Sequence, residues 1–156
     1  MHEYLQSILL PEQLINDLCN DDIDADTPAY LKKVSQLEEM LQKTKGQLPD
    51  SKALIEVKPE LEKLKFKVCA RARNFLIAKM NNLKKPKSNF QIYQQNILVK
   101  YKPLVTFLRE YHVETYVELS NLYSSMMDEV YYTQLKQYFA DTAKLIRPIP
   151  KSSDLL

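Results

Sequence analysis

The chain has 156 residues, a formal net charge of +2, 45% hydrophobic and 27% charged residues, and a single glycine, Gly46. This composition is typical of a folded soluble protein and not of a disordered one. The scarcity of glycine disfavours β-hairpins and phosphate-binding loops, which need positive φ angles, and no apolar run approaches the roughly 20 residues that span a bilayer. We therefore expect an all-α, cytosolic protein without a signal peptide.

The charge is distributed unevenly. Residues 1–60 carry six bases and twelve acids, residues 61–109 twelve bases and one acid, and residues 110–156 four bases and seven acids. The basic middle is best explained by lysines that face water or the acidic ends of the same chain. Binding of anionic lipid or nucleic acid through residues 61–109 is the alternative. No nucleic-acid-reading motif accompanies the charges, so nucleic acid is not among the expected partners.

Two helices are predicted in the first 50 residues. Pro11 can begin a short helix that runs to Leu18 and ends at the acidic loop NDDIDADT. Thr27 with Pro28 is typical of a helix start. The apolar stripe of this helix has helical spacing and consists of Tyr30, Val34, Leu37 and Leu41. Gly46 should end the helix.

One long amphipathic helix is predicted from Ser51 to about Lys85. Its apolar positions recur every three to five residues and are Leu54, Val57, Leu61, Leu64, Val68, Ala72, Phe75, Met80 and Leu83. Pro59 should kink this helix or mark its true start. The sequence Lys84-Lys85-Pro86 should stop it, because the residue before a proline is disfavoured in the α conformation.

Ser88 and Gln91 fit a capping box that starts the next helix. Its predicted stripe is Ile97, Leu98, Tyr101, Leu104, Val105 and Leu108, and Pro103 should bend it.

The last predicted helix runs from Val113 to about Ile146. Its stripe is Tyr116, Leu119, Tyr123, Met127, Val130, Leu135, Tyr138 and Leu145. Such a helix would be ~50 Å long, which predicts an elongated rod or bundle of helices. The expected organisation is short helices with an acidic loop over residues 1–50, a long-helix rod over residues 51–146, and an unstructured tail over residues 147–156.

The sequence predicts no enzyme, no metal site and no cofactor. His2 and His112 have no cysteine or acid at a suggestive spacing, and Cys19 and Cys69 are read as reduced thiols. Asp22, Asp24 and Asp26 occupy the first, third and fifth places of a calcium loop. The sixth place is Thr27 instead of glycine and the twelfth is Lys33 instead of glutamate, so the loop fails at both decisive places.

Two places are predicted to bind a partner. Tyr131 and Tyr132 are adjacent and cannot share one helix face, so at least one should be exposed, and tyrosine is enriched where proteins bind each other. The break at residues 84–89 is explained first as a corner between helices. A partner could also bind there through the charges of Lys84, Lys85 and Lys87 and the ring of Tyr93.

The residues from Lys52 to Tyr111, and again the segment YVELSNLYSSMMDEVYYTQLKQYFADTAKL, resemble the vacuolar protein sorting-associated protein 52 (Sac2) family; SILLPEQLINDL is similar to a segment further upstream in that family. The most specific part is KKPKSNFQIYQQNILVKYK. The residues there that match the family pattern are Pro86, Asn89, Gln91, Gln94, Gln95, Lys100 and Tyr101. Ser88 stands where threonine is more usual.

The resemblance implies a non-catalytic subunit of the GARP and EARP tethering complexes, which have a helical-rod architecture of the CATCHR type and act in retrograde transport from endosomes to the trans-Golgi network. The partners that it implies are the other subunits, a Golgi Rab GTPase in its GTP form and SNAREs. It also implies a peripheral location at the trans-Golgi network and endosomes. On this reading the chain is an internal fragment that lacks the family's N-terminal coiled coil and its C-terminal bundles.

Overall fold

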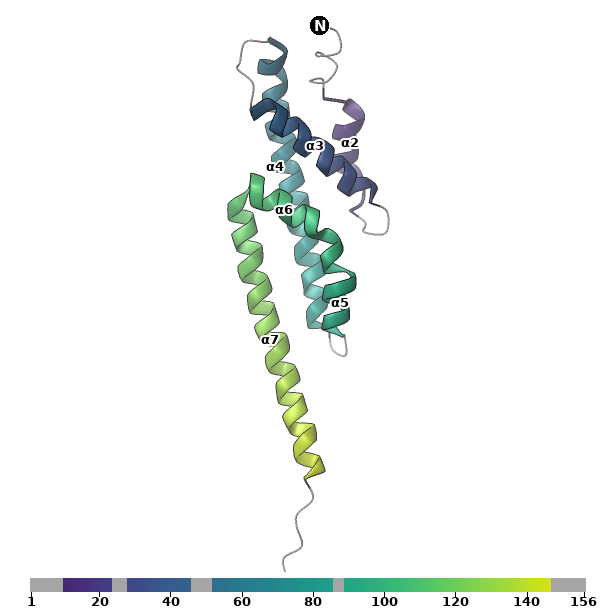
Figure 1. Ribbon diagram of the computed structural model, residues 1–156, viewed down its shortest axis with the longest axis vertical. Helices are drawn as coiled ribbons and strands as arrows, with labels where there is room; N and C mark the ends of the chain where they lie inside the picture. The colour runs from purple at the N-terminus through teal and green to yellow at the C-terminus, as the bar shows by residue number, and fades with distance from the viewer. Residues whose placement is uncertain (1–9, 24–27, 46–51, 86–88, 147–156) are drawn as a thin grey trace, which may run out of the picture.

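The computed structural model describes residues 10–23, 28–45, 52–85 and 89–146. These residues form α-helices and short 3-10 turns, with no strand among them. The helices stack into an elongated rod, in which α4 and α7 run in the same direction along the long axis (Figure 1). The expectation of an all-α, rod-like bundle is confirmed.

The first two described helices are α2 (Glu12–Asn20) and α3 (Ala29–Lys45). Pro11 occupies the N-cap of α2 with an extended backbone. Glu12 lies in the first turn, where its negative charge interacts favourably with the positive end of the helix dipole. The predicted stripe of α3 is buried in full, from Tyr30 to Leu41. The predicted start signal at Thr27 and the predicted end at Gly46 lie outside the described residues.

The long helix is α4 (Lys52–Asn81), and Pro59 lies inside it. The alternative that Pro59 marks the start of the helix is therefore wrong. A 3-10 turn, η1 (Asn82–Lys84), follows α4. Lys85 then has φ −64° and ψ 128°, which is the extended conformation expected before Pro86.

The next predicted helix is instead three elements, α5 (Phe90–Asn96), η2 (Leu98–Tyr101) and α6 (Lys102–Tyr111). Pro103 lies in the first turn of α6, where a bend within a helix was expected. The backbone nitrogen of a first-turn residue donates no intrahelical hydrogen bond, so proline is tolerated at this place. The cap of α5 is also corrected. The side chain of Asn89, not Ser88, accepts a hydrogen bond from the backbone N–H of Ile92 at 3.1 Å, while Ser88 lies outside the described residues.

The last helix, α7 (Val113–Leu145), has 33 residues and begins where the sequence predicts. His112 caps it, since Nδ1 accepts a hydrogen bond from the backbone N–H of Thr115 at 3.4 Å. The upper half of α7 packs against α4 and α6, whereas its lower half extends past the end of the other helices (Figure 1).

The main core runs along α4, which packs against α2, α3, α6 and α7. Tyr30, Leu37, Tyr101, Leu104 and Phe107 are among its fully buried side chains. A second, smaller cluster joins the η1–α5 corner to α7, and it contains Leu83, Phe90, Met127 and Val130. Helices α2 and α3 share the main core with α4 and α6, so helices from both sides of residue 50 in the sequence pack into one core.

The predicted stripes are wrong in two places. Leu135, Tyr138 and Leu145 were expected to be buried, but they are exposed because no described helix lies beside the end of α7. Val105 is also exposed, whereas Phe107, which the stripe omitted, is fully buried.

Candidate functional site

Much of the basic middle of the chain is engaged within the molecule. Arg73 donates from Nε to Oε2 of Glu118 at 2.8 Å and also pairs through Nη2 with Oε1 of the same carboxylate. Lys84 pairs with Glu129 at 2.5 Å. These contacts place bases of residues 61–109 against acids of the last third of the chain, as the favoured explanation of the charge pattern predicts.

Arg71 joins the basic middle to the acidic first third. Its guanidinium donates to the backbone carbonyl oxygens of Leu18 and Asp21, each at 2.5 Å. The same group lies over the ring of Tyr30, with Cζ 5.4 Å from the ring centroid. Carbonyl groups at the C-terminal end of a helix carry partial negative charge, and the positive guanidinium balances this charge at the end of α2. Arg71 is thus a structural clamp between α2, α3 and α4.

The acidic loop after α2 is linked to α3 by Lys33. Its Nζ lies 2.6 Å from a carboxylate oxygen of Asp21 and 3.0 Å from one of Asp17. Hydrogen bonds to Asp21 and Asp17 raise the pKa of Lys33. The side chain that occupies the twelfth place of the rejected calcium loop therefore forms ion pairs with nearby acids. Across the described residues, no group of three or more His, Cys, Asp or Glu side chains is arranged to hold a metal ion.

The corner between η1 and α5 is held together from inside. The hydroxyl of Tyr93 donates to the backbone carbonyl of Lys79 at 2.9 Å and accepts from the side-chain amide of Asn82 at 3.1 Å. Lys84 forms its ion pair with Glu129 of α7. Lys85 is exposed at the end of η1, and Lys87 lies outside the described residues. Two of the four residues predicted to bind a partner here thus stabilise the corner, and their role in binding stays a prediction.

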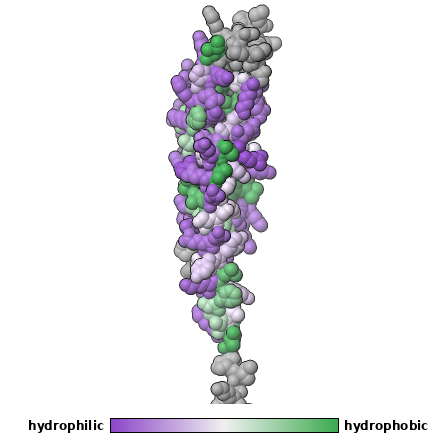
Figure 2. Space-filling model, turned by 90° about the vertical axis from the view of Figure 1, so that its left-hand side faces the viewer, coloured by the Kyte–Doolittle hydropathy of each residue, from purple (hydrophilic) through white to green (hydrophobic). Residues whose placement is uncertain are grey.

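Tyr131 and Tyr132 belong to a larger exposed surface at the end of α7. We call it the α7 apolar face; it consists of Tyr131, Tyr132, Leu135, Tyr138, Phe139, Leu145 and Ile146, whose exposed fractions range from 48% to 80%. Hydrophobic atoms gather at the narrow lower end of the rod, where α7 projects alone (Figure 2). The rings of Tyr131 and Phe90 pack in a T-shaped arrangement with their centroids 5.2 Å apart. Sequence reasoning selected the first two residues and assigned most of the others to the core.

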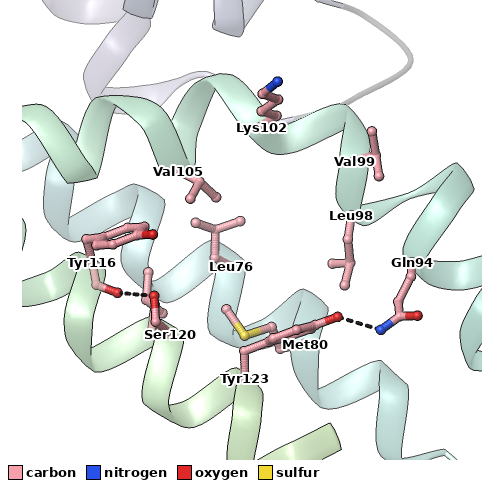
Figure 3. A pocket seen from close by; sticks show the side chains of 11 residues that line it. Leu76, Met80, Gln94, Leu98, Val99, Lys102, Val105, Tyr116, Ser120 and Tyr123 are labelled. Carbon is pink, nitrogen blue, oxygen red and sulfur yellow. Dashed lines mark hydrogen bonds between the residues drawn. The ribbon is translucent and has the colours of Figure 1, made fainter.

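A pocket of about 410 Å³ opens between η2–α6 and α7, above the floor formed by α4. Leu76 and Met80 lie at its base, and Tyr116 and Tyr123 of α7 lie along one side (Figure 3). One end is closed by Gln94 of α5, whose amide donates to the hydroxyl of Tyr123. The lining is mostly apolar and comes from four separate segments, and for this reason no motif in the sequence pointed to the pocket.

The two cysteines are free thiols. Burial raises the pKa of the Cys69 thiol to about 11, so this group is poorly suited to act as a nucleophile. Among the described helices, none is long and apolar enough to cross a membrane.

Comparison with known proteins identifies the family. The coiled-coil model of the Vps52/Sac2 family matches residues 1–108. The chain is 30% identical over 156 residues to vacuolar protein sorting-associated proteins 52 B and 52 A of Arabidopsis thaliana; the match covers 99% of this chain and 22% of each relative. It is 22% identical to the Homo sapiens homologue, over 99% of the chain and 21% of the relative. No solved structure matches the chain significantly.

The chain spans about a fifth of the length of the curated relatives that it matches. Residues 1–108 match the family model that is described as coiled-coil. That model covers more than half of the 156 residues. The chain therefore belongs to the Vps52/Sac2 family.

Proposed function

We propose that this chain is a non-catalytic, helical part of a multisubunit vesicle-tethering complex of the GARP/EARP type, which acts in retrograde transport from endosomes to the trans-Golgi network. The observation that carries the proposal is the family match along nearly the whole chain. An elongated helical scaffold of this kind works through contacts with other proteins and needs no reactive group.

The described surface is consistent with a binding role. Large contiguous apolar patches are uncommon on soluble monomers and mark interaction sites, and the α7 apolar face is such a patch. We propose this face, including Tyr131 and Tyr132, as the main partner-binding surface. Lys84, Lys85 and Tyr93 at the η1–α5 corner are a second candidate surface, and Lys87 is the further binding residue that the sequence predicts. The chain would act in the cytosol, held at the trans-Golgi network and endosomes by its partners.

The direct test is association with the other subunits. The full chain, tagged and expressed in cells, should co-purify with the remaining GARP or EARP subunits, and it should bind a Golgi Rab GTPase loaded with GTP more strongly than the same protein loaded with GDP. Co-purification of SNAREs would extend the list of partners. Absence of the tether subunits from the purified material would contradict the proposal.

A binding assay with acidic liposomes tests the alternative, in which the basic segment at residues 61–109 binds anionic lipid. Binding that falls steeply between low and moderate salt would favour this alternative. Weak binding is expected, because Arg71, Arg73 and Lys84 are already paired with groups of the chain itself.

A further inference from the structure

The pocket between η2–α6 and α7 has the size and the lining of a small-molecule site. Its volume of about 410 Å³ lies within the roughly 300–1,000 Å³ that is typical of such sites, which are mostly apolar and contain a few placed polar groups. Leu76, Met80 and Leu119 are lining residues that belong to the buried core. An occupant of the pocket must therefore be largely apolar.

The two ends of the pocket limit the shape of an occupant. One end is closed by Gln94, whose amide donates to the hydroxyl of Tyr123 and lies 3.3 Å from the sulfur of Met127. The other end lies toward the junction of α6 and α7, where His112 alone links the two helices. A helix is about 10 Å wide and cannot lie along a pocket with closed ends. A segment from the remainder of a longer protein could therefore enter only through the open side, with individual side chains.

Several polar groups of the lining already bond to each other. Gln94 and Tyr123 form one such pair, and the hydroxyl of Ser120 donates to the backbone carbonyl of Tyr116 at 2.8 Å. These groups have little need of a polar ligand. The part of the pocket near Gln94 thus favours the apolar portion of an occupant.

Two other polar groups are available nearer the α6–α7 junction. Within the described part of the chain, nothing bonds to the hydroxyl of Tyr116, and no acid pairs with Lys102, although Glu38 lines a smaller cavity that Lys102 also borders. Figure 3 shows the Tyr116 hydroxyl directed toward Val105, with the Lys102 ammonium group directed away from the base of the pocket. Lys102 and Val105 are three residues apart on α6 and so share one face of that helix. A hydroxyl donor and a positive charge thus border the same part of the rim.

We infer that this pocket binds a single-chain carboxylate, that is, a fatty acid, with its chain over Leu76 and Met80 and its head group at Tyr116 and Lys102. A carboxylate has one negative charge and two acceptor oxygens, which match one ammonium group and one hydroxyl. A phosphate monoester would bring close to two negative charges to a single lysine. The flexible stem of Lys102 allows its ammonium group to meet a head group at the rim. This binding goes beyond the proposed tethering role and does not depend on it.

The test measures binding of dodecanoate to the full chain by isothermal titration calorimetry, at concentrations where the ligand is monomeric. We expect saturable binding of one molecule per chain. Decanoate, which is shorter by two CH₂ groups, should bind roughly tenfold more weakly, because each buried CH₂ contributes a factor of about four. Dodecanol has the same chain without the charge and should bind several-fold more weakly than dodecanoate.

A change that fills the pocket tests the place of the chain. Val105→Trp should weaken binding of dodecanoate at least tenfold, because the indole occupies the space between α6 and α7. Val117→Trp is the matched control, since Val117 is an exposed valine of α7 outside the lining. Circular dichroism verifies that both variants keep their helix content.

Two milder changes test the place of the head group. Lys102→Gln and Tyr116→Phe should each weaken binding of dodecanoate several-fold and leave binding of dodecanol unchanged, because only the carboxylate uses these groups. Lys67→Gln is the matched control for the charge, since Lys67 is an exposed lysine of α4 outside the lining.

An absence of saturable binding would overturn the inference, and so would equal binding by a well-folded Val105→Trp chain. Dodecanol that binds as tightly as dodecanoate would overturn the assignment of a carboxylate. Binding to acidic vesicles that Val105→Trp abolishes, without binding of free dodecanoate, would assign the pocket to a membrane lipid instead.

Crosslinking in cells tests whether protein covers the pocket. A benzophenone amino acid replaces Val99, an exposed lining residue at the rim, and the chain is irradiated in cells. We expect most of the chain to stay free of crosslinks to protein. Crosslinking of most of the chain to another protein segment would show that the mouth is covered and would rule out a free fatty acid as the occupant.

Discussion

The guanidinium of Arg71 in α4 donates to the backbone carbonyl oxygen of Leu18 in α2 at 2.5 Å, across 53 residues of sequence. The same side chain reaches the carbonyl of Asp21, just after the end of α2. Leu18 also accepts a hydrogen bond from the hydroxyl of Tyr30 at 3.3 Å. Three elements that are separate in the sequence therefore meet at one carbonyl group.

Arg71→Ala should loosen α2 from the rest of the rod. The change leaves the carbonyl groups of Leu18 and Asp21 without their donor, and hydrogen bonds from charged groups contribute about 1.5–3 kcal/mol each. We expect urea denaturation to give a free energy of unfolding lower by about 2–3 kcal/mol, and hydrogen exchange to be faster in α2 than in α7. Arg71→Lys should lose most of the same stability, because an ammonium group cannot reproduce the two-pronged geometry. Unchanged exchange in α2 would contradict the assigned role.

Asn89→Ala should weaken the start of α5. The Asn89 side chain accepts from the N–H of Ile92, and loss of such a cap costs about 1 kcal/mol. Asn89→Asp keeps the acceptor and should retain the stability measured by urea denaturation. Equal effects of the alanine and aspartate changes would show that the side-chain acceptor does not matter.

The stability of the α3–α6 contact should depend on pH through Glu38. Burial raises the pKa of this carboxyl above its ordinary value of 4.5, and the charge of Glu110 and a hydrogen bond with it act in the same direction. Lys102 and Glu38 both line a small cavity between α3 and α6. Because the folded state holds the Glu38 proton more tightly than the unfolded state, the stabilisation is complete below pH 4.5 and is lost as the pH rises through the raised value.

Glu38→Gln tests this pH dependence. The variant should be more stable than the unchanged chain at neutral pH, and the decline in unfolding free energy on raising the pH from 4.5 should become smaller. Thermal denaturation at a series of pH values measures both effects. Glu39→Gln is the matched control, since Glu39 is the exposed neighbour on the same helix. An identical pH profile for Glu38→Gln and the unchanged chain would contradict the assignment.

Cys69 should resist thiol reagents in the folded protein. With its pKa raised to about 11 by burial, the ionised fraction at pH 7 is on the order of 10⁻⁴. In a Cys19→Ser background, labelling with a disulfide reagent should be slow in buffer and rapid in denaturant, as measured by mass spectrometry. Fast labelling in buffer would show that the core around Cys69 opens readily.

The sequence predicts much of this fold because the spacing of apolar residues shows where each helix runs and which of its sides is apolar. All four stripe residues of α3 are buried, and the start of α7 at Val113 is as predicted. Periodicity does not show whether another helix covers the stripe. For this reason Leu135 and Tyr138 were assigned to a core that ends before reaching them.

Other features depend on atoms that are distant in the sequence or on a choice between similar neighbours. Nothing near Arg71 in the sequence indicates that it reaches the carbonyl of Leu18. Asn89 and Ser88 are both good capping residues, and a shift of one residue decides between them. The pocket between α6 and α7 was missed because Leu76, Gln94 and Tyr123 meet only after the chain reverses at the η1–α5 corner.

The part of α7 from Tyr131 to Leu145 rises about 1.5 Å per residue and so spans about 22 Å of continuous helix beyond Val130, the last buried residue. A single unbroken helix is far stiffer than a loop of equal length. A partner bound at this end of α7 would therefore be held at a fixed distance from the α2–α3 end of the rod.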